Sequence, residues 1–172
     1  MWELWHYSTF RFNLLVLTVC WMSCSFGFYM LAYVLKYLNG SIFINAYSSS
    51  AGEIVGKLST IPLLRCTSLK RVFLIAFTMS ALGMLLLVIF SQSESWIPVM
   101  LMIARFGFSQ AFVASYLSMI LLYPTVLTST AIGICVTMSK MATIFAPMIA
   151  EIPSPTNLVI LLVIAIVSSI VS

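Results

Sequence analysis

Long runs of apolar residues recur from one end of this chain to the other. The chain has 172 residues, of which 62% are hydrophobic and 7% charged, and its mean hydropathy is +1.14. A soluble domain of this size would need many more charged residues on its surface. A helix that crosses a membrane needs about 20 consecutive, mostly apolar residues. The sequence therefore predicts an all-α integral membrane protein with six transmembrane helices, at about residues 13–35, 42–64, 71–91, 96–121, 127–150 and 157–172.

Charges in the joints between the runs predict an orientation. Because the joints are short, consecutive helices should be antiparallel and alternate joints should lie on the same side of the membrane. One side holds a basic cluster, Arg65, Lys70 and Arg71. The other side holds two acids, Glu94 and Glu151, and one opposing base, Lys36. Lys and Arg are enriched in cytoplasmic segments. We therefore expect both termini to be cytoplasmic, with residues 1–12 as a cytoplasmic or interfacial flank.

Three basic residues lie inside the apolar runs, namely Lys57, Arg105 and Lys140. A charge at mid-bilayer costs roughly 2.5 to 3.5 kcal/mol on insertion scales, so such residues usually face a protein interior or an aqueous cavity. Glu53 is the single acid in the same region. The excess positive charge in a low-dielectric wall favours anions. Aromatic side chains would add a surface suited to the flat apolar bodies of organic anions: Phe28, Tyr29, Tyr47 and Tyr116.

Each of these residues also has a purely structural interpretation. Glu53 and Lys57 are spaced i and i+4 with the acid first, which is the order that favours an ion pair on one helix. Lys140 has no acid within a helical turn, so it could pair with an acid on another helix. Arg105 could snorkel towards the membrane surface or serve packing. The aromatic side chains could simply pack between helices. The residues alone leave both interpretations open.

Sequence motifs for catalysis or metal binding are absent. The four cysteines form no CxxC pair, and the chain has one histidine, His6. The sequence also lacks paired carboxylates, a nucleophile beside a base, and a glycine-rich phosphate loop. We therefore expect a protein that is not an enzyme and uses no cofactor or metal. The net charge of +4 reflects topology and cavity lining, and it gives no ground for a nucleic-acid partner.

Several short stretches carry a family resemblance: Tyr123-Pro124-Thr125-Val126, Ser129-Thr130, Gly133-Ile134-Cys135, Phe145-Ala146-Pro147, Ile42-Phe43-Ile44 and Phe28-Tyr29. From about Cys20 to Pro147, the chain resembles the C-terminal half of organic ion transporters of the major facilitator superfamily. This branch holds the organic anion and organic cation carriers. The resemblance implies that residues 13–172 form one half-bundle, helices seven to twelve, of a twelve-helix carrier.

The same resemblance implies an anionic substrate. In that family, the residue seventeen positions after the tyrosine is cationic in the anion carriers and acidic in the cation carriers, and here it is Lys140. The anion carriers also have a lysine four residues after the acidic position of the eighth span, where Lys57 stands. The implied substrate-binding residues are Lys140, Lys57, Phe28, Tyr29 and Arg105. Structural or gating roles are implied for Glu53, Lys70, Arg71, Tyr123 and Pro124.

The resulting hypothesis is a carrier of small organic ions, with an anionic substrate, that works by alternating access in the plasma membrane. Such carriers bind substrate between two halves near mid-membrane. The last apolar run has only about 16 residues, short of a full crossing. We therefore expect the chain to be a fragment whose partners are the lipid bilayer and an N-terminal six-helix half. The alternatives are a degenerate half-carrier that acts as a membrane partner or scaffold without transport, and a pair of two copies.

Overall fold

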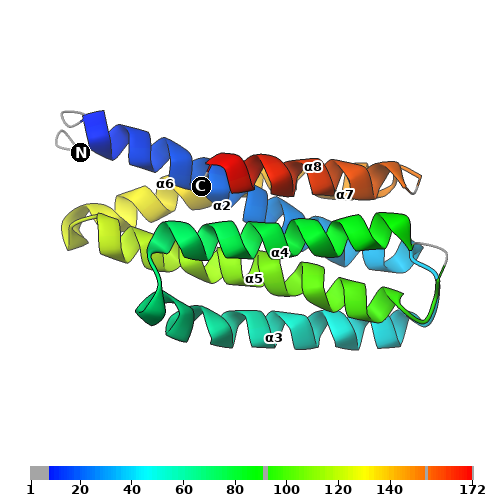
Figure 1. The fold of residues 1–172 in the computed structure, drawn as a ribbon. Coiled ribbons are helices and arrows are strands. Elements are labelled where there is room, and N and C mark those ends of the chain that lie inside the picture. Colours follow the sequence, from blue (N-terminus) through cyan, green and yellow to red (C-terminus); the bar gives the residue numbers. More distant parts are fainter. Residues whose placement is uncertain (1–7, 91–92, 154, 172) are drawn as a thin grey trace.

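The computed structural model describes residues 8–90, 93–153 and 155–171, with side chains from Phe12 onward. Residues 1–7 of the expected flank lie outside this range. Within the described ranges every regular element is a helix, which confirms the all-α prediction (Figure 1). The helices are α2 (Ser8–Val34), the 3-10 helix η1 (Leu35–Tyr37), α3 (Ile42–Cys66), α4 (Leu69–Ile89), α5 (Ile97–Leu122), α6 (Thr125–Thr143), α7 (Ala146–Ala150) and α8 (Thr156–Val171).

Helix α5 lies at the centre of the bundle, where it packs against α3, α4 and α2. Helix α4 also packs against α8, and α2 packs against α6. In Figure 1, α3 forms one edge of the molecule, and α6 and α8 lie on the other side of the α4–α5 pair. The span that contains α6 is the least covered: 17% of its most apolar part is buried, against 61% for the span of α5. The bundle therefore leaves a large face of α6 open.

Four described helical segments are long and apolar enough to cross a membrane: Phe12–Tyr37, Leu69–Ile89, Ile97–Leu122 and Thr125–Ala150. These four candidate spans coincide with four of the six predicted spans. Helix α8 is apolar but has only 16 residues. Helix α3 has 25 residues, but it carries Glu53, Lys57 and several serines. Both lie where spans were predicted, but α8 is shorter than the roughly 20 residues of a full crossing, and α3 is long enough but more polar than the four segments above.

The fifth predicted span, 127–150, is not one continuous helix. Helix α6 ends at Thr143, and the short helix α7 begins at Ala146. Pro147 explains the break, because proline has no N–H to donate and its ring clashes with the carbonyl group four residues earlier, which belongs to Thr143. The sequence predicts a helix end or bend at Pro147, and the interruption between α6 and α7 agrees with it. Lys140 therefore lies in the last turn of α6.

Small residues allow α3 to approach α5 closely. The buried residues of α3 are all small or polar: Asn45, Ser49, Gly52, Gly56 and Thr60. A Cβ atom at Gly56 would lie only 2.6 Å from the carbonyl oxygen of Phe106 on α5. Close backbone contact of this kind is typical of helix pairs in membranes. It brings Glu53 within reach of α5, while large apolar side chains such as Phe43 remain on the outer face of α3, 72% exposed.

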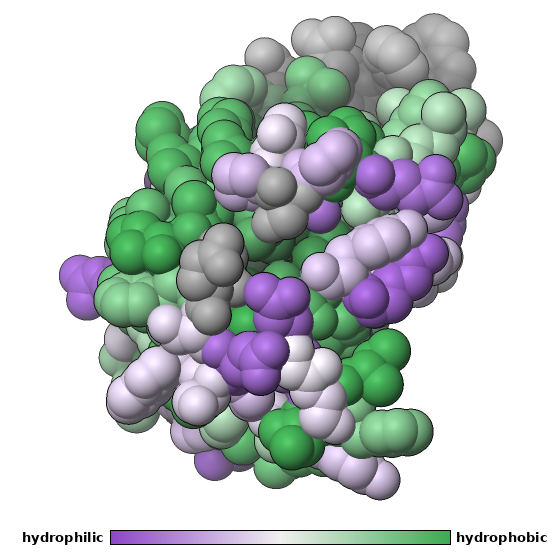
Figure 2. Space-filling view, turned by 90° about the vertical axis from the view of Figure 1, so that its right-hand side faces the viewer, coloured by the Kyte–Doolittle hydropathy of each residue, from purple (hydrophilic) through white to green (hydrophobic). Residues whose placement is uncertain are grey.

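The end of the bundle that carries residues 35–41, 93–96 and 151–153 faces the viewer in Figure 2. Hydrophilic residues are spread across this end, and hydrophobic residues lie between and around them. Such a distribution suits helix ends that reach the polar surface of a bilayer.

Candidate functional site

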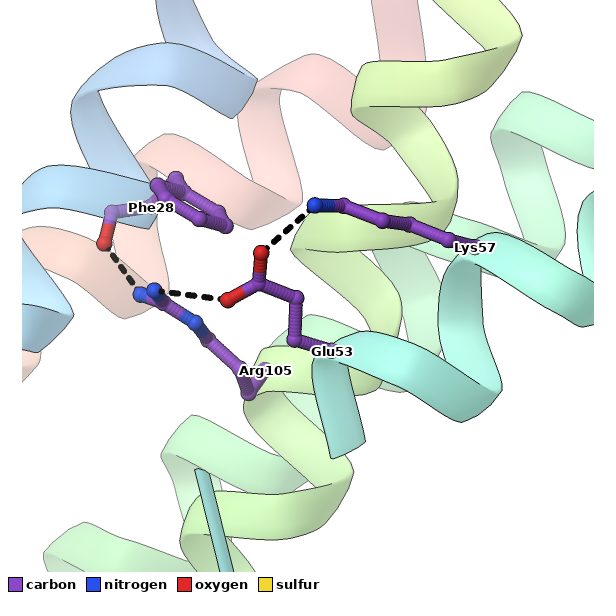
Figure 3. A network of polar contacts seen from close by, with 4 residues as sticks. All are labelled: Phe28, Glu53, Lys57 and Arg105. Atoms are coloured by element: carbon purple, nitrogen blue, oxygen red, sulfur yellow. Dashed lines mark hydrogen bonds and ion pairs between the residues drawn. The ribbon is translucent and has the colours of Figure 1, made fainter. Parts of the chain in front are cut away.

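A network of polar contacts joins α3, α5 and α2 (Figure 3). The Lys57 ammonium lies 2.6 Å from Oε1 of Glu53, and Nη2 of Arg105 lies 3.2 Å from Oε2 of the same carboxylate. Nη1 of Arg105 donates a hydrogen bond to the backbone carbonyl of Phe28. The two oxygens of Glu53 therefore serve two different cations.

The local structure explains why these groups meet. Glu53 and Lys57 are one turn apart on α3, so their side chains lie on the same face. The guanidinium of Arg105 lies 3.5 Å from the centre of the Phe28 ring, a cation–π contact that adds to the hydrogen bond. Arg105 is 7% exposed, whereas the Lys57 side chain is 47% exposed. Arg105 is thus buried, and Lys57 stays accessible to solvent.

The ammonium of Lys140 contacts a tyrosine. Its Nζ donates a hydrogen bond of 2.8 Å to the hydroxyl of Tyr29 and lies 4.6 Å from the centre of that ring. Among the described side chains, no carboxylate lies within ion-pair distance of Lys140. The acid on another helix, allowed for in the sequence analysis, is therefore not seen in this part of the chain. Lys140 also lines an open groove of about 620 Å³ with Tyr33, Val136 and Met141.

Aromatic rings connect the two basic sites. The Phe28 and Tyr29 rings lie 5.6 Å apart, and Phe28 lies 6.0 Å from Phe112 on α5. Phe112 lies 5.4 Å from Tyr116, which in turn lies 4.5 Å from Trp21. The five residues implied as substrate contacts therefore form one connected group, which runs from Lys140 through Tyr29, Phe28 and Arg105 to Glu53 and Lys57.

The charge of this connected group is positive. Lys57 and Arg105 share one carboxylate, which leaves one positive charge in the network, and Lys140 adds a second. Positive charge beside a low-dielectric wall raises the local concentration of anions.

Other residues named from the sequence lie elsewhere. Lys70 and Arg71 are exposed in the first turn of α4, at the end of the bundle where α5 stops. Tyr123 is the residue that ends α5, and Pro124 precedes α6. Tyr123 is 4% exposed, and burial raises the pKa of its phenol to about 12. Tyr47 is 76% exposed on the outer face of α3, away from the ring contacts described above.

Sequence reasoning missed two residues of this region. Phe112 bridges Phe28 and Tyr116, and Tyr33 lines the groove beside Lys140. Helical spacing carried a signal for both, because Phe112 stands seven residues after Arg105 and Tyr33 stands four after Tyr29. Residues at these spacings share a helix face.

Comparison with known proteins identifies relatives among solute carriers. No family model matches the chain. The chain is 28% identical to mouse Solute carrier family 22 member 4 over 130 residues, which cover 74% of this chain and 23% of the relative. It is 27% identical to mouse Solute carrier family 22 member 21, covering 78% of this chain and 25% of the relative. It is 26% identical to human Organic cation/carnitine transporter 2, covering 74% of this chain and 23% of the relative.

These relatives confirm the resemblance to organic ion carriers. The chain is homologous to solute carriers of family 22, which are transporters and not enzymes. Together with the apolar helices, this homology indicates a multi-pass membrane protein related to transport. The chain spans about a quarter of the length of these relatives.

Proposed function

We propose that this homologue of the family 22 solute carriers is the C-terminal half, helices seven to twelve, of a carrier that moves small organic ions by alternating access. The observation that supports this most directly is Lys140. Its ammonium lies at an open groove and is held by a tyrosine hydroxyl rather than by a carboxylate. A charge within a membrane span is costly, and a substrate of opposite charge would offset that cost.

We further propose that the substrate carries an anionic group that binds Lys140. A substrate whose only charged group is a cation would need a free carboxylate in the site. Both oxygens of Glu53 already accept hydrogen bonds, one from Lys57 and one from Arg105. One relative is named for organic cations and carnitine. Carnitine is a zwitterion with a carboxylate as well as a quaternary ammonium. A zwitterion therefore agrees both with the name of that relative and with the positive charge of the site, whereas a simple anion agrees with the charge alone.

The surroundings of Lys140 suit a substrate with an apolar body. The groove of about 620 Å³ that Lys140 lines lies within the size range of small-molecule sites. A second groove of about 610 Å³ shares Met141 with it and is lined by apolar side chains that include Met138 and Phe145. Methionine side chains are flexible and adapt to different ligand shapes. This composition supports a site that accepts several related organic ions.

The other residues take different roles in this proposal. Lys57, which is partly exposed, would leave its ion pair with Glu53 and pair instead with the anionic group of a substrate. Arg105 and Phe28 would hold Glu53 and α2 in place, and Tyr29 would orient Lys140. Lys70, Arg71, Tyr123 and Pro124 would act in gating, since all lie at the end where α4 begins and α5 stops.

We also propose a membrane and an orientation. The basic joint at Arg65 and Lys70 would face the cytoplasm, and so would both termini, because positively charged joints are retained on that side. The membrane would be the plasma membrane. Residues 1–12 would form the interfacial flank, and residues 13–172 the six-helix domain.

Ligand binding to variants of Lys140 tests the proposal. The protein in lipid nanodiscs is titrated with radiolabelled benzoate, carnitine and tetraethylammonium, which carry an anion, a zwitterion and a cation. Lys140→Ala should weaken benzoate and carnitine by about tenfold, the usual effect of losing a hydrogen bond to a charged group. Lys140→Asp should weaken the binding of benzoate and carnitine further and strengthen the binding of tetraethylammonium, because the electric field at the site changes sign.

Lys36→Ala is the matched control. Lys36 is also an exposed lysine whose ammonium lies 4.6 Å from the centre of a tyrosine ring, that of Tyr37. Its loss should leave binding unchanged. Unaltered benzoate binding by Lys140→Ala would remove Lys140 from the site. Tight binding of tetraethylammonium by the unmodified protein would overturn the proposed substrate charge.

A further inference from the structure

A separate cavity lies at the end of the bundle that carries the basic joint. Its volume is about 480 Å³, it is partly open, and it is lined by α2, α4 and the last residues of α5 and α8. It shares no lining residue with the groove at Lys140. The proposed function assigns gating to Lys70, which lines this cavity, but gives the cavity itself no role.

The polar residues that line this cavity lie towards one end of it. Its polar members, Asn13, Ser68 and Lys70, stand near the start of α2 or at the start of α4. One turn further along the same helices the lining becomes apolar, with Val16 on α2 and Phe73 on α4. The polar members therefore lie at the end of the bundle, where Phe12, Leu69 and Leu122 also line the cavity, and the lining further along α2 and α4 is apolar.

The charge that the described lining residues bring to the cavity is positive. Among the residues whose side chains the structure describes, from Phe12 onward, Lys70 is the only charged one that lines it. Arg65 and Arg71 lie in the same joint, outside the lining. A basic pocket between membrane helices, at the level of the headgroups, is a recognised way of binding anionic lipid.

We propose that this cavity binds one anionic phospholipid from the surrounding bilayer, with the phosphate at Lys70 and one acyl chain along Val16 and Phe73. A phospholipid in the leaflet has the same order of groups as the cavity, charged at the surface and apolar towards the middle. A small hydrophilic anion would leave the apolar part unfilled. The proposal is independent of the direction and the substrate of transport.

Lipid binding to variants of the whole chain tests this proposal. The purified protein is titrated with phosphatidylglycerol and with phosphatidylcholine of the same acyl chains, and the bound lipid is counted by native mass spectrometry. Lys70→Ala should lower the affinity for phosphatidylglycerol by about fivefold, as expected for one lysine near a charged surface. The affinity for phosphatidylcholine should not change. Arg65→Ala is the matched control, because it removes a charge from the same joint but not from the cavity. It should have a clearly smaller effect.

Two further measurements test the acyl chain. Val16→Trp fills the apolar part of the cavity, so it should weaken both lipids, while circular dichroism shows whether the variant keeps its helices. A variant that has lost its helices is replaced by Val16→Phe, read in the same way. Glycerol 1-phosphate, which has a headgroup and no acyl chain, should not compete with phosphatidylglycerol. Equal losses in Lys70→Ala and Arg65→Ala would show diffuse attraction to the joint and overturn the site. Competition by glycerol 1-phosphate, or an unchanged affinity in a folded Val16 variant, would overturn the seated acyl chain.

Discussion

Glu53 pairs with two cations of very different exposure, and this difference determines how much each contact contributes to stability. Arg105 is nearly buried, so its charge depends on Glu53 and on the Phe28 carbonyl for compensation. The Lys57 side chain is about half exposed and retains water around its ammonium. Ion pairs at exposed positions contribute little, whereas removing one partner of a buried pair leaves an uncompensated charge. Glu53 should therefore matter mainly through Arg105.

Glu53→Gln should destabilise the protein by about 2 kcal/mol, less than for a fully buried pair because the carboxylate is partly exposed. Lys57→Met should cost under about 1 kcal/mol. The double variant Glu53→Gln with Arg105→Gln should recover part of the loss, because no lone charge remains. Denaturant unfolding in detergent micelles, followed by tryptophan fluorescence, measures all three. Equal losses in the two single variants would show that Arg105 does not depend on Glu53.

At this scale the sequence predicted contacts within one helix better than contacts between helices. The spacing of Glu53 and Lys57 was sufficient to suggest the ion pair that the structure contains. The partner of Lys140 could not be found this way, because Tyr29 is 111 residues away and the contact depends on how α2 packs against α6. Whether these residues bind a substrate stays a prediction.

Among the helices, α3 differs in how it is held. It packs on α5 through glycines and small polar residues, and the backbone of α5 passes where a side chain would otherwise stand. Two glycines in the chain make this requirement testable. A Cβ atom at Gly56 would collide with the Phe106 carbonyl, whereas one at Gly133 on α6 would meet nothing within 4 Å.

Gly56→Ala should lower stability by about 1 to 3 kcal/mol, the usual range for overpacking, and should push α3 away from α5. Gly133→Ala is the control with the same chemical change. It should leave stability unchanged or raise it by up to about 1 kcal/mol, because alanine favours the helix. The same unfolding measurement reports both. A stable Gly56→Ala variant would show that the two helices can separate at no cost.

The positions of the helices were largely predictable, because long apolar runs leave few alternatives in a membrane. The positions at which a helix is interrupted within an apolar run were harder to predict. The interruption between α6 and α7 depends on Pro147, but the other prolines show that the residue alone does not decide: Pro62 lies inside α3 without ending it. Whether the freed carbonyl groups find other partners depends on neighbouring helices.

For the molecule as a whole, the proposal of a half-carrier makes function depend on a second half. Alternating access requires two bundles that rock about a central site. The chain spans about a quarter of its relatives, and its α6 leaves a broad face uncovered. A missing N-terminal half would cover that face.

Vesicles that contain the chain alone should take up no more labelled carnitine or benzoate than empty vesicles. Vesicles that contain the chain together with the N-terminal six helices of mouse Solute carrier family 22 member 4 should take up at least one of them. Uptake by the chain alone would contradict the half-carrier and favour a pair of two copies. No uptake in either case, from a chain that still binds the added half, would favour the scaffold alternative.

The polar character of α3 has a consequence for how the protein is made. As the chain leaves the ribosome, α3 reaches the translocon before α5 has been synthesised, so Glu53 and Lys57 arrive without Arg105. An isolated helix with these charges at its centre enters lipid poorly. We therefore expect helix α3 to enter the bilayer together with α5, so that the order of insertion would differ from the order of translation.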